Sequence, residues 1–131
     1  MSHLLISSHN PLLIKSIYGM LRDIGYSIDI TDHPADAVRQ VFNNKYDAVI
    51  LDSRDVGLTA SDASEIIGSI SPDTRVVILG EAQDKTTATT FPNSDQLDDL
   101  KTYLSEVFDH NNRNHNKGGL YDTKRDYSKS L

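Results

Sequence analysis

The clearest strand in the sequence is DAVILD, residues 47–52. Its apolar centre, residues 48–51, is continuous rather than alternating with polar residues, as expected for a parallel strand that is covered on both faces. A second continuous apolar run, RVVIL at 75–79, predicts another buried strand. Shorter apolar runs at 3–7 and 26–30 predict two more strands. Together these runs predict a sheet with hydrophobic core on both of its faces.

Helical patterns separate the predicted strands. Asn10 followed by Pro11 is typical of a helix N-cap with proline at the first helical position, and Gly25 follows where a C-cap glycine is expected. Apolar residues recur at spacings of three and four in the later helices, which places Phe42 and Ile66 on core-facing sides. The predicted starts of these later helices are Pro34, Thr59 or Ser61, and Asn93 or Ser94.

The alternation of strands and helices predicts a flavodoxin-like α/β fold, a doubly wound parallel sheet with helices on both faces. Only ten residues lie between Gly80 and Phe91, whereas a parallel crossover normally takes a dozen or more. We therefore expect the helix between the fourth and fifth strands to be missing or shortened. The fifth strand is predicted at residues 86–90, either parallel after an extended loop or antiparallel at the sheet edge.

The composition limits the classes of function. A length of 131 residues suits one domain with a hydrophobic core, and the net charge of -6 offers no electrostatic footprint for nucleic acid. The absence of cysteine excludes disulfides and thiolate metal sites. No apolar run approaches the ~20 residues of a membrane span, and the N-terminus does not read as a secretory signal. We therefore expect a cytoplasmic protein that binds neither nucleic acid nor membrane.

The composition changes at His110, where a polar and asparagine-rich segment begins. Residues 110–131 have no apolar period, so we predict a disordered, mildly basic C-terminal tail after a folded domain at 1–109. The tail could be simply solvated, as chain termini commonly are. The alternative is a short docking peptide that uses Leu120, Tyr121 and Tyr127.

Three segments together resemble the response-regulator receiver domain family. They are LLISSHNP at 4–11, YDAVILD at 46–52 and VGL at 56–58, and the resemblance covers about residues 3 to 108. It implies a CheY-like fold and a role in two-component signal transduction or a phosphorelay. In this family an aspartate at the end of the third strand accepts a phosphoryl group, and Asp52 matches it. That reaction needs Mg²⁺ to neutralise the incoming charge.

The other positions depart from the family's pattern. Ser8 and His9 stand where the family has the acidic pair that holds Mg²⁺. Gly80 replaces the Thr or Ser that bonds the phosphoryl oxygen, and Phe91 replaces a lysine at the end of the fifth strand. Arg54, close to Asp52, is a candidate phosphate contact. Degenerate members of this kind are known as pseudo-receivers and typically serve as protein-interaction modules.

Three functional hypotheses follow. We prefer a pseudo-receiver that binds another signalling protein, such as a histidine kinase or a downstream effector, without phosphorylation. The alternatives are an atypical phosphorelay receiver that is phosphorylated on Asp52, and a small-molecule sensor with an apolar pocket at the carboxyl ends of the strands. No nucleophile–base arrangement or glycine-rich phosphate loop occurs, so we expect no enzyme and no catalytic residue. We also expect no metal or cofactor, except Mg²⁺ if Asp52 is phosphorylated; the sequence leaves the oligomeric state open.

Overall fold

The computed structural model describes residues 2–53, 57–80, 88–91 and 97–118. It contains a five-stranded sheet in which the strand order is β2-β1-β3-β4-β5 and every neighbouring pair is parallel. This order is that of flavodoxin-like doubly wound sheets, so the predicted fold class is confirmed. The strands are β1 (His3–Ser7), β2 (Ser27–Thr31), β3 (Ala48–Asp52), β4 (Arg75–Leu79) and β5 (Thr89–Phe91).

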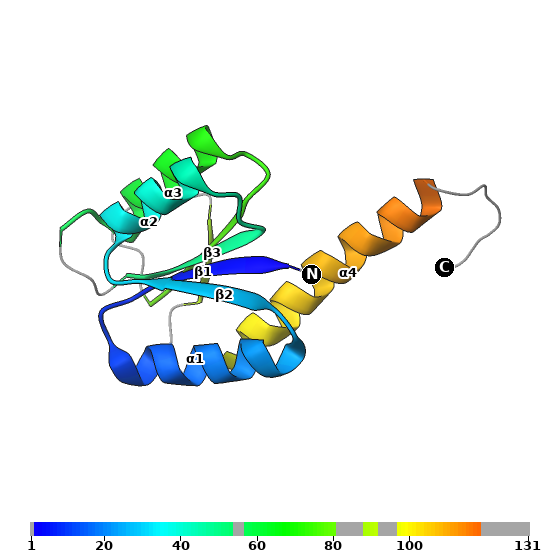
Figure 1. Ribbon diagram of the computed structural model, residues 1–131, viewed down its shortest axis with the longest axis horizontal. Coiled ribbons are helices and arrows are strands. Elements are labelled where there is room, and N and C mark those ends of the chain that lie inside the picture. The colour runs from blue at the N-terminus through cyan, green and yellow to red at the C-terminus, as the bar shows by residue number, and fades with distance from the viewer. Residues whose placement is uncertain (1, 54–56, 81–87, 92–96, 119–131) are drawn as a thin grey trace. The chain divides into compact units, whose positions relative to one another are not determined.

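Three helices flank the sheet. Figure 1 shows α2 (Pro34–Asn43) and α3 (Ala60–Ile70) on one face, and α1 (Pro11–Ile24) on the other. This arrangement follows from right-handed crossovers between parallel strands. Because β1, β3 and β4 run in the same direction, the loops that follow them lie at one edge of the sheet, which we call the carboxyl edge.

The predicted starts of the first three helices are confirmed, whereas Asn93 and Ser94, predicted to cap the last helix, lie outside the described residues. The Asn10 side chain accepts hydrogen bonds from the N–H groups of Leu12 and Leu13 at the start of α1, and Gly25 ends that helix at a φ of 113°. Thr59, rather than Ser61, caps α3, because its hydroxyl accepts from the Asp62 N–H at 3.0 Å. α2 begins at Pro34 as predicted.

The core beneath α2 and α3 joins both helices to the central strands. Its buried members are Leu5, Val49, Leu51 and Ile78 from the sheet, Ala37 and Val41 from α2, Ala60, Ala63 and Ile67 from α3, and Tyr46, which precedes β3.

Two apolar side chains predicted to face this core are exposed. Phe42 is 73% exposed and Ile66 is 39% exposed. Each is the immediate neighbour of a buried residue, Val41 or Ile67, and successive residues of a helix point about 100° apart. The prediction that Phe42 and Ile66 face the core was therefore wrong. The buried face of each helix is centred on the neighbouring residue instead.

Tyr46 is fully buried and connects several elements near the amino ends of the strands. Its hydroxyl donates to Asp29 Oδ2 at 2.7 Å, and its backbone carbonyl accepts from Thr74 Oγ1 at 2.8 Å. His3 Nε2 lies 3.0 Å from the same Asp29 oxygen. Burial, and then the hydrogen bond to Asp29, raise the pKa of the Tyr46 phenol above its ordinary value of 10.0. The phenol therefore stays a neutral donor in the folded state.

The fifth strand is parallel, which decides between the two predicted arrangements. β5 pairs with β4 from Val77↔Thr89 to Leu79↔Phe91. Strand β5 comprises three residues and begins later than predicted, and nine residues, 80–88, connect it to β4. This connection is shorter than a usual parallel crossover. Residues 81–87, on which the missing or shortened helix was predicted, lie outside the described residues.

The last helix is longer than predicted. α4 runs from Leu97 to Gly118, so the backbone is helical over the first nine residues of the segment we predicted as a disordered tail. Leu100, Leu104 and Phe108 are its buried apolar residues. The rest of the predicted tail, 119–131, lies outside the described residues, and the predicted domain division at 109/110 stays a prediction. None of the helices in the described part of the chain is long and apolar enough to cross a bilayer.

Candidate functional site

The carboxyl edge brings Ser8 and Asp52 into contact. Asp52 is the last residue of β3, and Ser8 directly follows the neighbouring strand β1. Ser8 Oγ donates a hydrogen bond to Asp52 Oδ2 at 2.8 Å, and the two side chains are 1% and 2% exposed. The predicted phosphoacceptor position therefore carries a buried carboxylate whose oxygen is bound by a hydroxyl.

Ser8 connects three segments as well as holding Asp52. Its backbone N–H donates to the Thr31 carbonyl at the end of β2, at 3.0 Å. Its hydroxyl oxygen also accepts from the Asn10 N–H at 3.0 Å, next to the cap of α1. Ser8 is thus a fixed structural link between β1, β2, β3 and α1, and its hydroxyl group both donates and accepts.

Gly80 and Phe91, the other two departures from the receiver pattern, are also neighbours. The Gly80 N–H donates to the Phe91 carbonyl at 2.8 Å. Gly80 has a φ of 97°, and a Cβ built on it would lie closer than 3.0 Å to Ser53 Oγ, a separation that real Cβ atoms do not show. Ser53 was not predicted as a site residue, although its position directly after Asp52 was the available signal.

His9, which follows Ser8, has an exposed side chain. It stacks on His33, the residue before α2, with ring centroids 5.4 Å apart and planes at 16°. This contact is not a metal-ligand geometry, because imidazole ligands present ring nitrogens to a shared ion rather than their faces to each other. Arg54, the predicted phosphate contact, lies outside the described residues.

The described part of the carboxyl edge does not fit Mg²⁺. The ion prefers six oxygen ligands, usually with one or two carboxylates, waters and phosphate. Here the Asp52 carboxylate is buried and bound by Ser8, while Ser8 and His9 occupy the positions that the family resemblance assigns to acidic ligands. Among the described residues no group of three His, Cys, Asp or Glu is placed to hold a metal ion.

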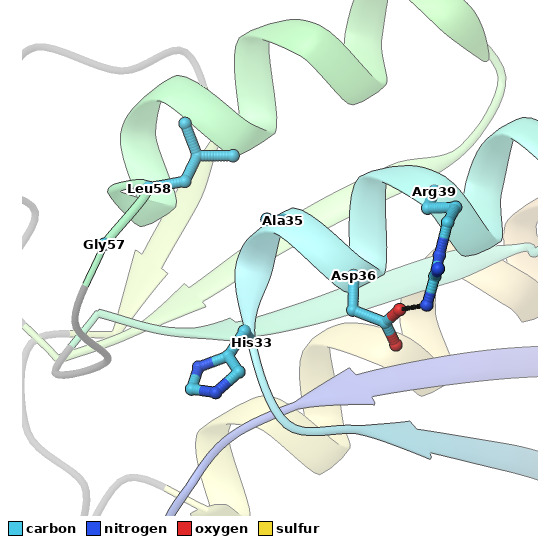
Figure 2. Close-up of a pocket in the computed structure, with 6 residues that line it drawn as sticks. All are labelled: His33, Ala35, Asp36, Arg39, Gly57 and Leu58. Atoms are coloured by element: carbon cyan, nitrogen blue, oxygen red, sulfur yellow. Dashed lines mark hydrogen bonds and ion pairs between the residues drawn. The ribbon is translucent and has the colours of Figure 1, made fainter.

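A cleft of about 520 Å³ lies beside this edge, where the start of α2 faces the turn before α3. Figure 2 shows the Asp36–Arg39 ion pair on one side and the Leu58 side chain on the other. The size is in the range of small-molecule sites. Apolar atoms make up most of the lining surface, as the sensor hypothesis predicted, although three of the six lining residues have ionisable side chains. It consists of His33, Ala35, Asp36, Arg39, Gly57 and Leu58.

Asp36 contributes a carboxylate to the cleft, and two side chains hold it. Thr31 Oγ1 donates to its Oδ2, and Arg39 binds its Oδ1. The hydrogen bond from Thr31, followed by the one from Arg39, lowers the pKa of the Asp36 carboxyl below its ordinary value of 3.8. The ionised carboxylate is therefore the form that the folded protein favours.

This shift predicts a pH-dependent contribution to stability. A lowered folded-state pKa gives stabilisation that is present above the unfolded-state pKa and is lost as the pH falls through the folded-state value. We expect the urea midpoint of the wild type to exceed that of Asp36→Asn at neutral pH, and the difference to shrink between about pH 5 and pH 2. Asp23→Asn, at an exposed position of α1, is the matched control. A difference that is constant with pH, or that the control reproduces, would contradict the prediction.

Comparison with known proteins identifies solved structures that share this fold. No family model matches the sequence, and no curated protein sequence matches it. TrrA, a response regulator protein from Thermotoga maritima, matches with a TM-score of 0.74 at 23% identity, over 82% of this chain and 99% of that chain. The receiver domain of a sensor histidine kinase from Pseudomonas aeruginosa PAO1 matches with 0.69 at 20% identity, over 80% and 95%. This chain has a receiver fold.

The similar structures also show what other receiver folds bind. TrrA was solved in complex with Mg²⁺-BeF, and the Pseudomonas aeruginosa domain with a magnesium ion coordinated in its active site cleft. A third match, with a TM-score of 0.71 at 22% identity, comes from the complex of the histidine kinase ThkA with TrrA; it covers 82% of this chain and 98% of that chain. At these identities the comparison establishes the receiver fold for the present chain.

Proposed function

We propose that this protein is a pseudo-receiver, a receiver-fold domain that acts in cytoplasmic signal transduction by binding another signalling protein without being phosphorylated. The observation that carries the proposal is the hydrogen bond from Ser8 Oγ to the buried Asp52 carboxylate. Binding, rather than catalysis, is the proposed activity.

The chemistry of phosphoryl transfer supports this proposal. An anionic phosphate approaches a carboxylate only when positive charge offsets the repulsion between them, which is the role of Mg²⁺ in such sites. At the carboxyl edge, a neutral hydroxyl and an exposed imidazole stand at the positions of the acidic ligands. Asp52 is also only 2% exposed, so its carboxylate offers little open surface to a phosphoryl donor.

The proposed partner is a histidine kinase or a downstream effector. The structural similarity to TrrA supports this class of partner, because TrrA was solved in complex with the kinase ThkA. We propose that the partner binds at the carboxyl edge, where the chain presents the exposed His9–His33 pair and the adjacent cleft. In this proposal, binding depends on the surface of the edge and not on a covalent change at Asp52.

Incubation with acetyl phosphate and Mg²⁺ tests the proposal directly. We expect the intact mass of the purified protein to stay unchanged, under conditions in which a control receiver gains one phosphoryl group of ~80 Da. Asp52→Asn serves as the matched variant and should give the same spectrum as the wild type. The physical reason is that the described carboxyl edge does not supply the ligand set for the metal ion.

The opposite outcome is equally specific. A gain of one phosphoryl group in the wild type that is absent from Asp52→Asn would show that Asp52 is a working phosphoacceptor. The pseudo-receiver proposal would then be wrong, and the atypical phosphorelay receiver would replace it. A gain that persists in Asp52→Asn would assign the modification to another residue and would contradict the proposal that the protein acts without phosphorylation.

A further inference from the structure

Gly80 and Ser53 compete for one small volume at the ends of β4 and β3. A Cβ on residue 80 would overlap Ser53 Oγ, while the Ser53 Cβ itself would lie at an ordinary contact distance of 3.5 Å. Ser53 is only 8% exposed, so its hydroxyl has little open solvent into which to rotate. In this conformation the Ser53 hydroxyl and a methyl group at residue 80 would occupy the same space, so Gly80→Ala requires either the hydroxyl or the backbone to move.

Backbone hydrogen bonds hold both residues in place. The Ser53 N–H donates to the Leu79 carbonyl at 2.9 Å, and the Gly80 N–H donates to the Phe91 carbonyl at 2.8 Å. Each residue directly follows its strand, and β3 and β4 are paired up to Asp52↔Leu79. The contact between Ser53 and Gly80 therefore lies between two loops whose starting points are fixed by the sheet.

We propose that Ser53 and Gly80 form a steric lock that holds the carboxyl ends of β3, β4 and β5 in one conformation. The hydroxyl of Ser53 fills the space over Gly80, and Gly80 adopts a positive φ that side chains disfavour. The lock rests on the proposed function, in which the partner binds at this edge, and it would present that edge in one conformation. The lock concerns conformation alone, and its test is independent of whether Asp52 accepts a phosphoryl group.

A second glycine with nearly the same φ separates the effect of the overlap between residue 80 and Ser53 from the effect of backbone strain. Gly57 has a φ of 96°, almost the same as the 97° of Gly80, but a Cβ at Gly57 would meet nothing within 4 Å. Gly57→Ala therefore measures the strain of a side chain at positive φ alone. Gly80→Ala measures the same strain together with the overlap against Ser53.

A double-mutant cycle tests the lock. The urea midpoints of the wild type, Ser53→Ala, Gly80→Ala and Ser53→Ala/Gly80→Ala are compared, with Gly57→Ala as the reference for strain. We expect Gly80→Ala to lower the midpoint about twice as far as Gly57→Ala. In the Ser53→Ala background, we expect the Gly80→Ala shift to fall to that of Gly57→Ala, because the alanine at 53 retains the Cβ and removes the overlapping Oγ.

Hydrogen exchange measured by NMR supplies a second readout. In Ser53→Ala we expect the Gly80 N–H to exchange about tenfold faster, while amides in the middle of β3 keep their protection, because only the edge is loosened. The proposal is overturned if the Gly80→Ala shift is the same in both backgrounds, which would mean that the Ser53 hydroxyl simply rotates away. It is also overturned if Gly80 exchange is unchanged in Ser53→Ala.

Discussion

Replacing Tyr46 with alanine should lower the free energy of unfolding by about 3–5 kcal/mol, the range found when large buried aromatic side chains are truncated. The Tyr46 side chain is 1% exposed and lies in the core between the sheet and the helices α2 and α3. Its ring also lies 4.6 Å from the His3 ring, measured between centroids. Alanine would leave a cavity in that core and would leave Asp29 without the phenol donor. Urea denaturation monitored by circular dichroism measures the loss.

Tyr46→Phe separates packing from hydrogen bonding. It keeps the ring and removes the hydroxyl that donates to Asp29 Oδ2. We expect a cost of about 1 kcal/mol, because one hydrogen bond is lost and His3 still lies next to the same Asp29 oxygen. If Tyr46→Phe is as destabilising as Tyr46→Ala, the hydrogen bond and not the packing dominates, and the argument from cavity formation is wrong.

The fold was predictable because its strongest physical signals are local. The continuous apolar runs in β3 and β4 require cover on both faces, and the Asn10 and Gly25 caps mark both ends of α1. The exposed positions of Phe42 and Ile66 were not predictable from apolarity, because the exact rotation of a helix depends on tertiary packing. The direction of β5 could not be predicted either, because the strand that it pairs with is not indicated by any local pattern in the sequence.

The candidate site was predictable in position and not in detail. Parallel strands end at a common edge, so the sequence already placed Ser8 and Asp52 at that edge. The hydrogen bond between them depends on side-chain rotation at two buried positions. The contact of Ser53 with Gly80 and the cleft at the start of α2 depend on loop conformation, for which the sequence carries no periodic signal.

Ser8→Ala is expected to cost about 1–3 kcal/mol of the free energy of unfolding, because it leaves two polar groups without the Ser8 hydroxyl. Asp52 Oδ2 loses a donor at 2.8 Å, and the Asn10 N–H loses an acceptor at 3.0 Å. An alanine occupies the space of the serine without strain, so the loss measures hydrogen bonding at the carboxyl edge. Urea denaturation at neutral pH provides the measurement.

The neighbouring serine is a stringent control for this prediction. Ser7 is 0% exposed, and in the described part of the chain its Oγ has no hydrogen-bond partner. Ser7→Ala should therefore leave stability unchanged or raise it, because it removes a buried polar atom whose desolvation is not compensated. Equal losses for Ser7→Ala and Ser8→Ala would mean that both measure general packing. No loss for Ser8→Ala would mean that its hydroxyl does not hold the Asp52 carboxylate, and the observation that carries the pseudo-receiver proposal would fail.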